Sequence, residues 1–246
     1  PNELVVTLKP GAKKSIQELA RQLGAKVVGS IDELNTYRLQ FKDEEAAKAA
    51  RESLAAEPDV GDLEANFSMR NPTQMEKLQL GSTPPFPLKP KISSDASKVV
   101  IGLVDSPVQT LAPGMNEFLL PALHVAGEPG SANSQLTHGT SMAETILHGL
   151  TLASQEAGGS SVRILPVDVY GSSPDTSTFD VAKGIYAAID AGATIINLSM
   201  GGDGDSKILA NLIRDSYKGG VLFFGAAGNQ PSISPTYPAA YPEVVA

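Results

Sequence analysis

From Lys98 onward, the chain alternates apolar runs with amphipathic helical patterns, and this alternation limits the fold more than any other feature. The run "KVVIGLVD" at 98–105 is almost continuously apolar, which is typical of a strand buried on both faces. Further strands are predicted at "VRILPVDVY", "ATIINLSM" and "VLFFGAAGN", and helices at "SMAETILHGLTLA", "TFDVAKGIYAAIDAG" and "SKILANLIRDSYKGG". Repeated β-α units predict an α/β fold in which helices flank a parallel sheet.

Residues 1–70 follow a different pattern, which predicts a small α+β domain. "ELVVTL" is a β-branched run, and "KKSIQELARQLG" places its apolar residues on one helical face and ends at a glycine. "KVVGSI" and "TYRLQF" follow as strands, and "DEEAAKAARESLAA" as a helix whose acidic first turn suits the helix dipole. With a last strand in "VGDLEANFSM", the order is β-α-β-β-α-β, the ferredoxin-like arrangement.

Between these regions, residues 71–98 contain five prolines and little periodicity. Because proline fixes φ and lacks a backbone donor, we predict a largely extended linker. The expected organisation is therefore an α+β domain over 1–70, a linker over 71–98 and an α/β domain over 99–246.

The composition excludes several classes of protein. The 246 residues include no cysteine, so disulfides, zinc–thiolate sites and cysteine nucleophiles are excluded. The net charge is −8, and residues 99–246 carry 13 acidic against 5 basic side chains, a balance that repels phosphate backbones; we expect no nucleic-acid partner. No apolar run is long enough for a membrane span. The start at Pro1 shows no signal peptide, and we expect that any such segment was removed earlier.

Three polar residues lie where strands end or helices begin. Asp105 ends the first buried strand, His138 begins the next helix, and Asn229 follows "VLFFGAAG". In parallel sheets, active residues gather beyond the carboxyl ends of the strands. Singly, each has an ordinary explanation as a cap, a polar surface residue or a turn residue. Together they match acyl-transfer chemistry, which needs an imidazole base, a carboxylate to orient it and an amide donor for the oxyanion.

At these residues, the chain resembles the subtilisin-like serine proteases (subtilases). "IGLVDS" is similar to the family's Asp segment, "THGTSMAETI" to its His segment and "VLFFGAAGNQ" to its oxyanion-hole segment. "GIYAAIDAGATIINLSMGG" is similar to the helix, strand and loop that line the substrate cleft, and "YPAAYPEVVA" to the stretch after the Asn. The resemblance implies a serine endopeptidase in which Asp105 orients, His138 is general acid and base, and Asn229 holds the oxyanion.

The segment "LTHGTSMAET" contains overlapping His-Gly-Thr and Gly-Thr-Ser-Met-Ala signals. In the family, the nucleophilic serine follows the Asn, whereas Ser141 precedes Asn229 and lies three residues after His138 on one helix. We therefore expect Ser141 to be a helix residue. The nucleophile is expected beyond Ala246, with the rest of the domain cleaved off, forming a separate chain or never built, so this chain alone should be inactive.

One departure from the family concerns the turn after Asp105. The family usually has glycine after Asp-Ser or Asp-Thr, but here Ser106 precedes Pro107. We expect a differently shaped turn, because proline fixes φ and lacks a donor. His124 and His148 lie outside the motifs and are expected to be structural or surface residues.

The resemblance also implies a substrate pocket walled by "LSMGG" and "AAGN", with a small residue before "Tyr-Pro" near its floor. Small residues there predict an open pocket for medium or large apolar side chains. The residues assigned to it are Ser199, Met200, Gly201, Ala226, Ala227, Gly228 and Thr236.

The N-terminal pattern is similar to the propeptide domain that precedes many subtilases. This implies a secreted or periplasmic zymogen that acts on peptide or protein substrates. Its propeptide would assist folding, bind the catalytic domain and send a tail through the active site from "ANFSMRNP". The remaining C-terminal part of the catalytic domain would be a second partner. Calcium is a candidate cofactor by resemblance only, since the acidic residues form no recognisable calcium loop, and no metal ligand is assigned.

Three other interpretations stay open at this point. The chain could be a non-catalytic pseudoprotease that binds peptides or a partner on a subtilase-shaped scaffold. It could be an inhibitor or folding module in which the N-terminal domain does the biochemical work. Residues 1–70 could also be an unrelated small α+β domain.

Overall fold

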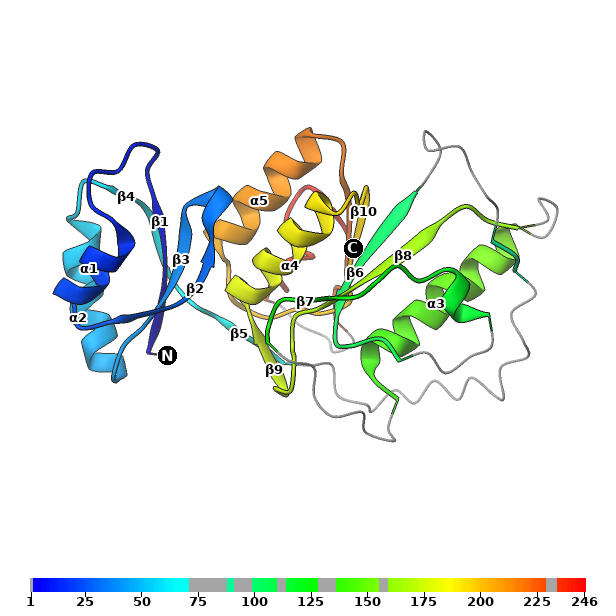
Figure 1. Cartoon of the computed structure of the whole chain (residues 1–246), viewed down its shortest axis with the longest axis horizontal. Coiled ribbons are helices and arrows are strands. Elements are labelled where there is room, and N and C mark those ends of the chain that lie inside the picture. Colours follow the sequence, from blue (N-terminus) through cyan, green and yellow to red (C-terminus); the bar gives the residue numbers. More distant parts are fainter. Residues whose placement is uncertain are drawn as a thin grey trace. The chain divides into compact units, whose positions relative to one another are not determined.

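The computed structural model describes residues 2–70, 88–90, 99–109, 114–127, 136–154, 159–228 and 234–246. The chain divides into two compact units (Figure 1). The first comprises Pro1–Ser68 with two short segments, Ser177–Phe179 and Ser206–Ile208. The second comprises Met69–Thr176, Asp180–Asp205 and Leu209–Ala246.

The first unit contains the predicted β-α-β-β-α-β order. Its elements are β1 (Glu3–Leu8), α1 (Ile16–Gln22), β2 (Lys26–Ile31), the short 3-10 helix η1 (Asp32–Leu34), β3 (Thr36–Gln40), α2 (Glu44–Ala55) and β4 (Val60–Ala65). The four strands form a sheet in the order β2-β3-β1-β4, with antiparallel neighbours. This is the strand order of a ferredoxin-like fold, as the sequence pattern indicated.

Local signals in the sequence begin both helices of this unit. The Ser15 side chain accepts a hydrogen bond from Glu18 N, and Asp43 accepts one from Ala46 N, so each helix has a side-chain N-cap. The apolar faces of both helices and of the sheet then form one core. Its buried members are Leu4, Val6, Leu8, Ile16, Leu19, Ala20, Leu39, Phe41, Ala47, Ala50, Leu54 and Val60.

The second unit contains the predicted parallel sheet. Its strands are β6 (Val100–Asp105), β7 (Leu123–His124), β8 (Arg163–Asp168), β10 (Ile195–Leu198), β11 (Leu222–Gly225) and β12 (Val244–Val245). They lie in the order β12-β11-β10-β6-β8-β7, and all of these pairs are parallel. The helices are α3 (His138–Ala153), α4 (Thr178–Asp190) and α5 (Lys207–Lys218), besides the 3-10 turn η3 (Met115–Glu117).

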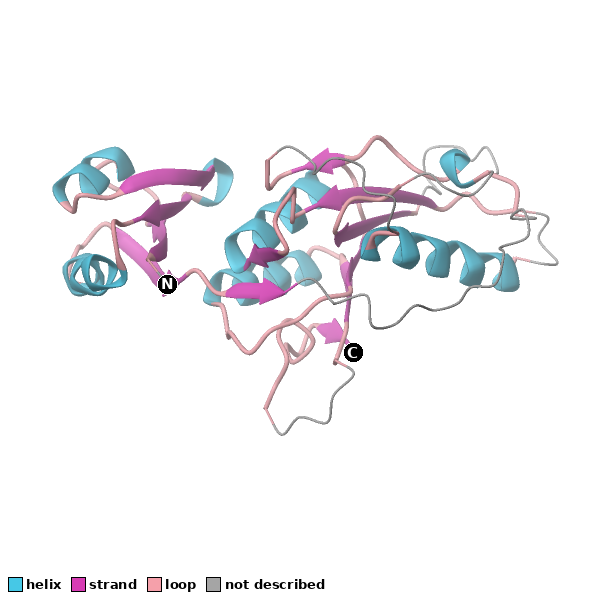
Figure 2. Ribbon diagram, turned by 90° about the horizontal axis from the view of Figure 1, so that it is seen from below, coloured by secondary structure: helices cyan, strands magenta, loops and turns pink. Residues whose placement is uncertain are grey.

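Helices α3 and α4 pack on opposite faces of β6. A Cβ on Gly102 would come within 2.9 Å of Ala188 Cβ on α4, so a glycine lets this helix approach closely. The next residue, Leu103, points to the other face and shares a core cluster with Ala143 and Leu147 of α3. The sheet is therefore covered on both faces at β6, which is the α/β layering that the sequence predicted. Figure 2 shows α3 as the long helix beside these strands.

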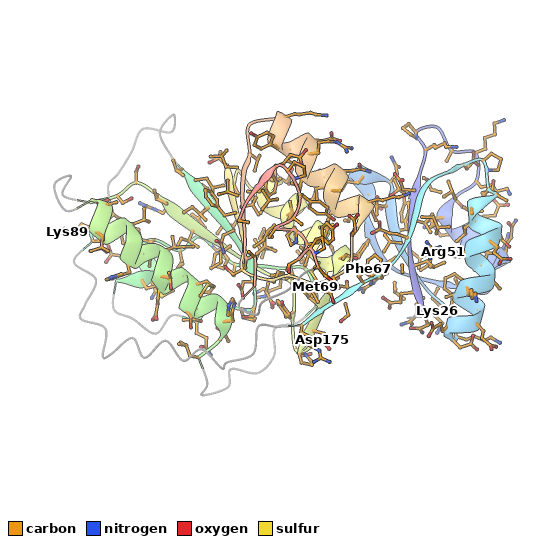
Figure 3. All side chains as sticks on the ribbon, turned by 180° about the vertical axis from the view of Figure 1, so that it is seen from behind. Lys26, Arg51, Phe67, Met69, Lys89 and Asp175 are labelled. Carbon is orange, nitrogen blue, oxygen red and sulfur yellow. The ribbon has the colours of Figure 1, made fainter. Side chains whose placement is uncertain are left out.

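Two short strands were not predicted as a pair. β5 (Ser68–Arg70) and β9 (Asp175–Ser177) form a two-stranded sheet, in which Met69 and Arg70, like Asp175, belong to the second unit. Met69 is 1% exposed, and Figure 3 labels it near Asp175.

Most of the predicted linker, residues 71–98, lies outside the described residues. Its described part, 88–90, packs into the second unit. Leu88 belongs to the same buried cluster as Leu103, and Pro90 forms a β-bridge with Ser160. Three linker residues therefore contribute to the α/β unit.

Candidate active site

The site begins with a carboxylate at the end of a central strand. Asp105 is the last residue of β6, which lies between β10 and β8, and it is 1% exposed. The α/β pattern predicts this position, because the polar ends of parallel strands share one edge of the sheet. The buried carboxylate needs donors, since burying an unpaired charge is costly.

His138 supplies one of these donors. It is the first residue of α3, and its Nδ1 lies 2.9 Å from each oxygen of the Asp105 carboxylate. The histidine side chain is 21% exposed. The structure therefore brings together two of the three predicted catalytic residues, from segments 33 positions apart in the chain.

The pairing defines which nitrogen carries the proton. A carboxylate can only accept, so Nδ1 of His138 is the donor and Nε2 of the neutral ring is left as an acceptor. Asp105 also stabilises the imidazolium that forms when Nε2 takes a proton. The arrangement can act as a general base whose orientation is set by a buried acid.

Ser106 connects the carboxylate to the helix. Its backbone N donates to Asp105 Oδ1 at 2.7 Å, and its Oγ lies 3.2 Å from the same oxygen. The same Oγ accepts a hydrogen bond from Gly139 N at 2.9 Å. The helix start is thereby held directly against the residue that follows Asp105.

A glycine makes this contact sterically feasible. A Cβ on Gly139 would lie 2.1 Å from the carbonyl oxygen of Ser106, far inside any allowed contact. Sequence reasoning identified His138 in this segment but missed the roles of Gly139 and Ser106. The only available signal was their place directly beside the two catalytic candidates.

The turn after Ser106 carries the Pro107 departure. The Pro107 carbonyl accepts a hydrogen bond from Thr137 Oγ1 at 2.5 Å. Thr137 is also the N-cap of α3, and its side chain accepts from Thr140 N. The turn with proline is thus tied to the helix that carries His138.

Ser141 lies one turn along the same helix. Its Oγ is 3.4 Å from the Thr137 carbonyl oxygen, so the hydroxyl bonds back to the helix backbone. This is the behaviour of an ordinary helical serine. Asn229, the predicted oxyanion donor, lies outside the described residues.

The predicted pocket residues come from two loops that meet. A Cβ on Gly201 would lie 2.5 Å from Thr236 Cγ2 and 3.7 Å from the Ala226 carbonyl oxygen. A Cβ on Gly228 would lie 3.9 Å from Thr236 Oγ1. Gly201, Ala226, Gly228 and Thr236 therefore lie close together. The side chain of Met200 is buried, with 1% exposure. Asn197 Nδ2 donates a hydrogen bond to Ser199 Oγ at 2.7 Å, and Ala227 is exposed.

Other titratable groups of this unit take different roles. Burial raises the pKa of the Tyr170 hydroxyl, and the Asp105 carboxylate acts in the same direction, so this phenol stays protonated. Its oxygen contacts the Arg70 carbonyl oxygen at 3.4 Å and Met200 Sδ at 3.9 Å. His124, expected to be a structural or surface residue, is exposed, and its Nδ1 lies 3.3 Å from the buried carboxylate of Asp168.

Metal-ligating side chains do not gather in the described residues. Within these ranges, no group of three or more His, Asp or Glu side chains is placed to hold a metal ion. No helix in the described part of the chain is both long and apolar enough to cross a membrane.

Comparison with known proteins places this geometry in a family. Residues 96–246 match the model of the subtilase family, Peptidase_S8. The chain belongs to the subtilase family. Residues 1–66 of this subtilase match a second model, the fervidolysin N-terminal prodomain. The α/β part and the small N-terminal part thus correspond to the two kinds of domain that the sequence motifs indicated.

Individual relatives are similar over part of their length. This subtilase is 29% identical over 156 residues to thermitase from Thermoactinomyces vulgaris, with 62% of this chain and 55% of thermitase covered. It is 30% identical over 150 residues to subtilisin Savinase from Lederbergia lenta, with 61% and 55% covered. The chain therefore spans about half the length of these two curated relatives.

A solved structure shows the same fold over nearly the whole chain. Fervidolysin from Fervidobacterium pennivorans, described as a keratinolytic enzyme related to subtilisin, aligns with a TM-score of 0.70 at 18% sequence identity. The alignment covers 99% of this chain and 42% of that one.

Proposed function

We propose that this subtilase chain is part of the precursor of a serine endopeptidase. The observation that carries the proposal is the 2.9 Å pairing of His138 Nδ1 with the buried carboxylate of Asp105. Because Nδ1 carries the proton in this geometry, Nε2 of the neutral ring is the nitrogen that can take a proton from a hydroxyl nucleophile. The subtilase family match over residues 96–246 supports the reaction class.

The proposed mechanism assigns one step to each residue. A serine in the part of the protein that follows residue 246 attacks the peptide carbonyl, and His138 Nε2 takes its proton. Asp105 holds the ring and stabilises the imidazolium, and Asn229 donates to the tetrahedral oxyanion. His138 then gives the proton to the amine as the peptide C–N bond breaks, which leaves an acyl-serine, and the same base activates the water that hydrolyses this ester and restores the serine. Removing the Asn229 donor should cost about 3–4 kcal/mol of transition-state stabilisation.

The N-terminal region is proposed to act as an intramolecular chaperone and inhibitor. Its match to a prodomain family over residues 1–66 supports this role. In the complete precursor, peptidase activity should appear only after the N-terminal region has been cleaved and removed. Activity of the uncleaved precursor equal to that of the mature form would exclude an inhibitory role.

Secretion is proposed as well. One relative, the halolysin-like protease Nep of Natrialba magadii, is named extracellular and is 33% identical over 156 residues. The mature protein should therefore accumulate in the culture medium of its source. Retention of all activity in the cytoplasmic fraction would contradict this.

The catalytic assignment can be tested with a fluorophosphonate probe on the complete protein. The probe should label one serine C-terminal to residue 246, and His138→Ala should abolish labelling because the serine loses its base. His148→Ala is the matched control, because His148 is an exposed histidine on the same helix.

Two outcomes would reject the proposal. Labelling that persists in His138→Ala would remove the base assignment. A folded wild-type protein that is neither labelled nor active on peptides would favour the non-catalytic, peptide-binding alternative.

A further inference from the structure

Gln109 lies four residues after Asp105 and touches the first turn of α3 at two points. Its side-chain Oε1 accepts a hydrogen bond from Thr137 N at 3.2 Å. Its backbone N donates to Thr140 Oγ1 at 2.7 Å. These two threonines stand on either side of His138, so Gln109 contacts the helix just before and just after the imidazole.

The hydroxyl groups of Thr137 and Thr140 form hydrogen bonds whose donors and acceptors can be assigned. Thr137 Oγ1 donates its proton to the Pro107 carbonyl, at 2.5 Å. In the 2.6 Å contact between the two hydroxyls, Thr140 Oγ1 is therefore the donor and Thr137 Oγ1 the acceptor. The chain of bonds runs from Gln109 N to Thr140, then to Thr137, then to Pro107.

This chain closes a ring between two segments. It begins and ends in the turn 107–109 and passes through the helix start at 137–140. Thr140 is 0% exposed, so water cannot replace its partners. Bonds of this kind strengthen one another in a dry environment. The ring is therefore a rigid connection between the turn after Asp105 and the helix that carries His138.

The ring supplements the contact at Ser106. The bond from Gly139 N to Ser106 Oγ holds the helix start against the residue that follows Asp105. The Oε1 of Gln109 also accepts from Thr137 N, a group at the helix N-terminus that has no intrahelical acceptor. The bonds of Gln109 to Thr137 and Thr140 add attachments on either side of His138 in the chain, and these restrain the turn and the helix from pivoting.

We propose that Gln109 is a positioning residue that keeps the imidazole Nδ1 of His138 directed at the Asp105 carboxylate. Gln109 bonds to Thr137 and Thr140, the two threonines that flank His138, and acts on the imidazole through them. The inference rests on the proposed role of His138 as the base. It concerns the orientation of the ring and does not depend on the presence of a nucleophile.

The test is imidazole ¹⁵N NMR on the 246-residue chain, which contains three histidines. The ¹⁵N shifts distinguish the Nδ1–H tautomer, the Nε2–H tautomer and the imidazolium. In the wild type, His138 should be the Nδ1–H tautomer, because Asp105 accepts that proton. A wild-type His138 in the Nε2–H tautomer would instead refute the Asp–His pairing itself, and so the proposed function.

Gln109→Met keeps the length of the side chain and removes the acceptor. We expect the Nε2–H tautomer of His138 to become clearly populated, because Asp105 then accepts the Nδ1 proton less consistently. Gln109→Glu keeps an Oε1 acceptor for Thr137 N and should preserve the Nδ1–H tautomer. The resonances of His148 and His124 should be unchanged in both variants.

A pair of threonines supplies the matched control. Thr140→Val removes a buried hydroxyl from the hydrogen-bond ring that links Gln109, Thr140, Thr137 and Pro107. It should change the tautomer of His138 as Gln109→Met does. Thr145→Val removes an exposed hydroxyl that bonds within the same helix, to Ser141 O, and should have no effect on His138.

Three results would overturn the proposal. One is an unchanged His138 in folded Gln109→Met and Thr140→Val. Another is an equal disturbance by Gln109→Glu and Gln109→Met, because the acceptor would then not be the positioning group. The third is a shift of all three histidines together, because that pattern reports a general loss of structure.

Discussion

Replacing Gly139 with alanine should separate the two halves of the candidate site. The new Cβ would lie 2.1 Å from the Ser106 carbonyl oxygen and 3.1 Å from its carbonyl carbon. Both are backbone atoms, so no side chain can rotate to make room. To reach the 3.4 Å at which ordinary contact begins, helix α3 and the turn must separate by about 1.3 Å.

This displacement is large compared with the bonds that cross the contact. Gly139 N to Ser106 Oγ and His138 Nδ1 to Asp105 are each 2.9 Å long, and both would be lost at such a separation. Losing a hydrogen bond costs about 1 kcal/mol, or about 1.5–3 kcal/mol with a charged partner. Alanine regains up to about 1 kcal/mol of helix propensity. The free energy that stabilises α3 in the second unit should therefore fall by about 2–3 kcal/mol.

Hydrogen exchange of the α3 amides is the suitable assay, because it reports local stability and needs no single two-state transition. A loss of about 2 kcal/mol corresponds to roughly thirtyfold faster exchange. Gly149→Ala is the matched control, since it changes the same helix and no atom lies within 4 Å of its added Cβ. That variant should exchange more slowly than wild type.

One result would refute the steric argument. If Gly139→Ala protects α3 as well as Gly149→Ala does, the close approach to Ser106 does not constrain the site.

Two further predictions concern other parts of the chain. Burial raises the pKa of the Glu144 carboxyl. The folded state therefore holds the proton more tightly than the unfolded state, and the free energy of unfolding falls as pH rises from the unfolded pKa through the folded one. Glu144→Gln, which is always neutral, should be more stable than wild type at pH 7 and gain nothing at pH 3; a urea titration showing the reverse order would contradict this. Asp43 caps α2 through Ala46 N at 2.8 Å, so Asp43→Ala should cost about 1 kcal/mol in urea unfolding, whereas Lys42→Ala, one residue outside the helix cap, should cost almost nothing.

Much of the fold could be predicted because its signals are local in the sequence. Ser15 caps α1 and Asp43 caps α2, and both are strong N-cap residues. The apolar run that ends at Asp105 identified the central strand, since few other elements are apolar on both faces. The short strand β7 escaped prediction, because two residues carry no periodicity.

The candidate site was predictable only in part. Asp105 and His138 were found because each lies at a strand end or helix start and within a family motif, and the structure brings them together. The linker prediction did not foresee that Leu88 packs into the α/β core. A single apolar residue among prolines has no pattern that distinguishes burial from exposure.

The sequence by itself indicated the main strands and helices, the change from an α+β to an α/β pattern, and Asp105 and His138 as the candidate acid and base. These follow from periodicity, capping residues and motifs, which depend on near neighbours along the chain. Only the tertiary structure decided what holds the acid to the base: the glycine contact at Gly139 and the ring of bonds from Gln109 to Thr137 and Thr140. The reason is physical, because hydrogen bonds and contacts of a few ångströms between distant segments depend on the path of the backbone in space.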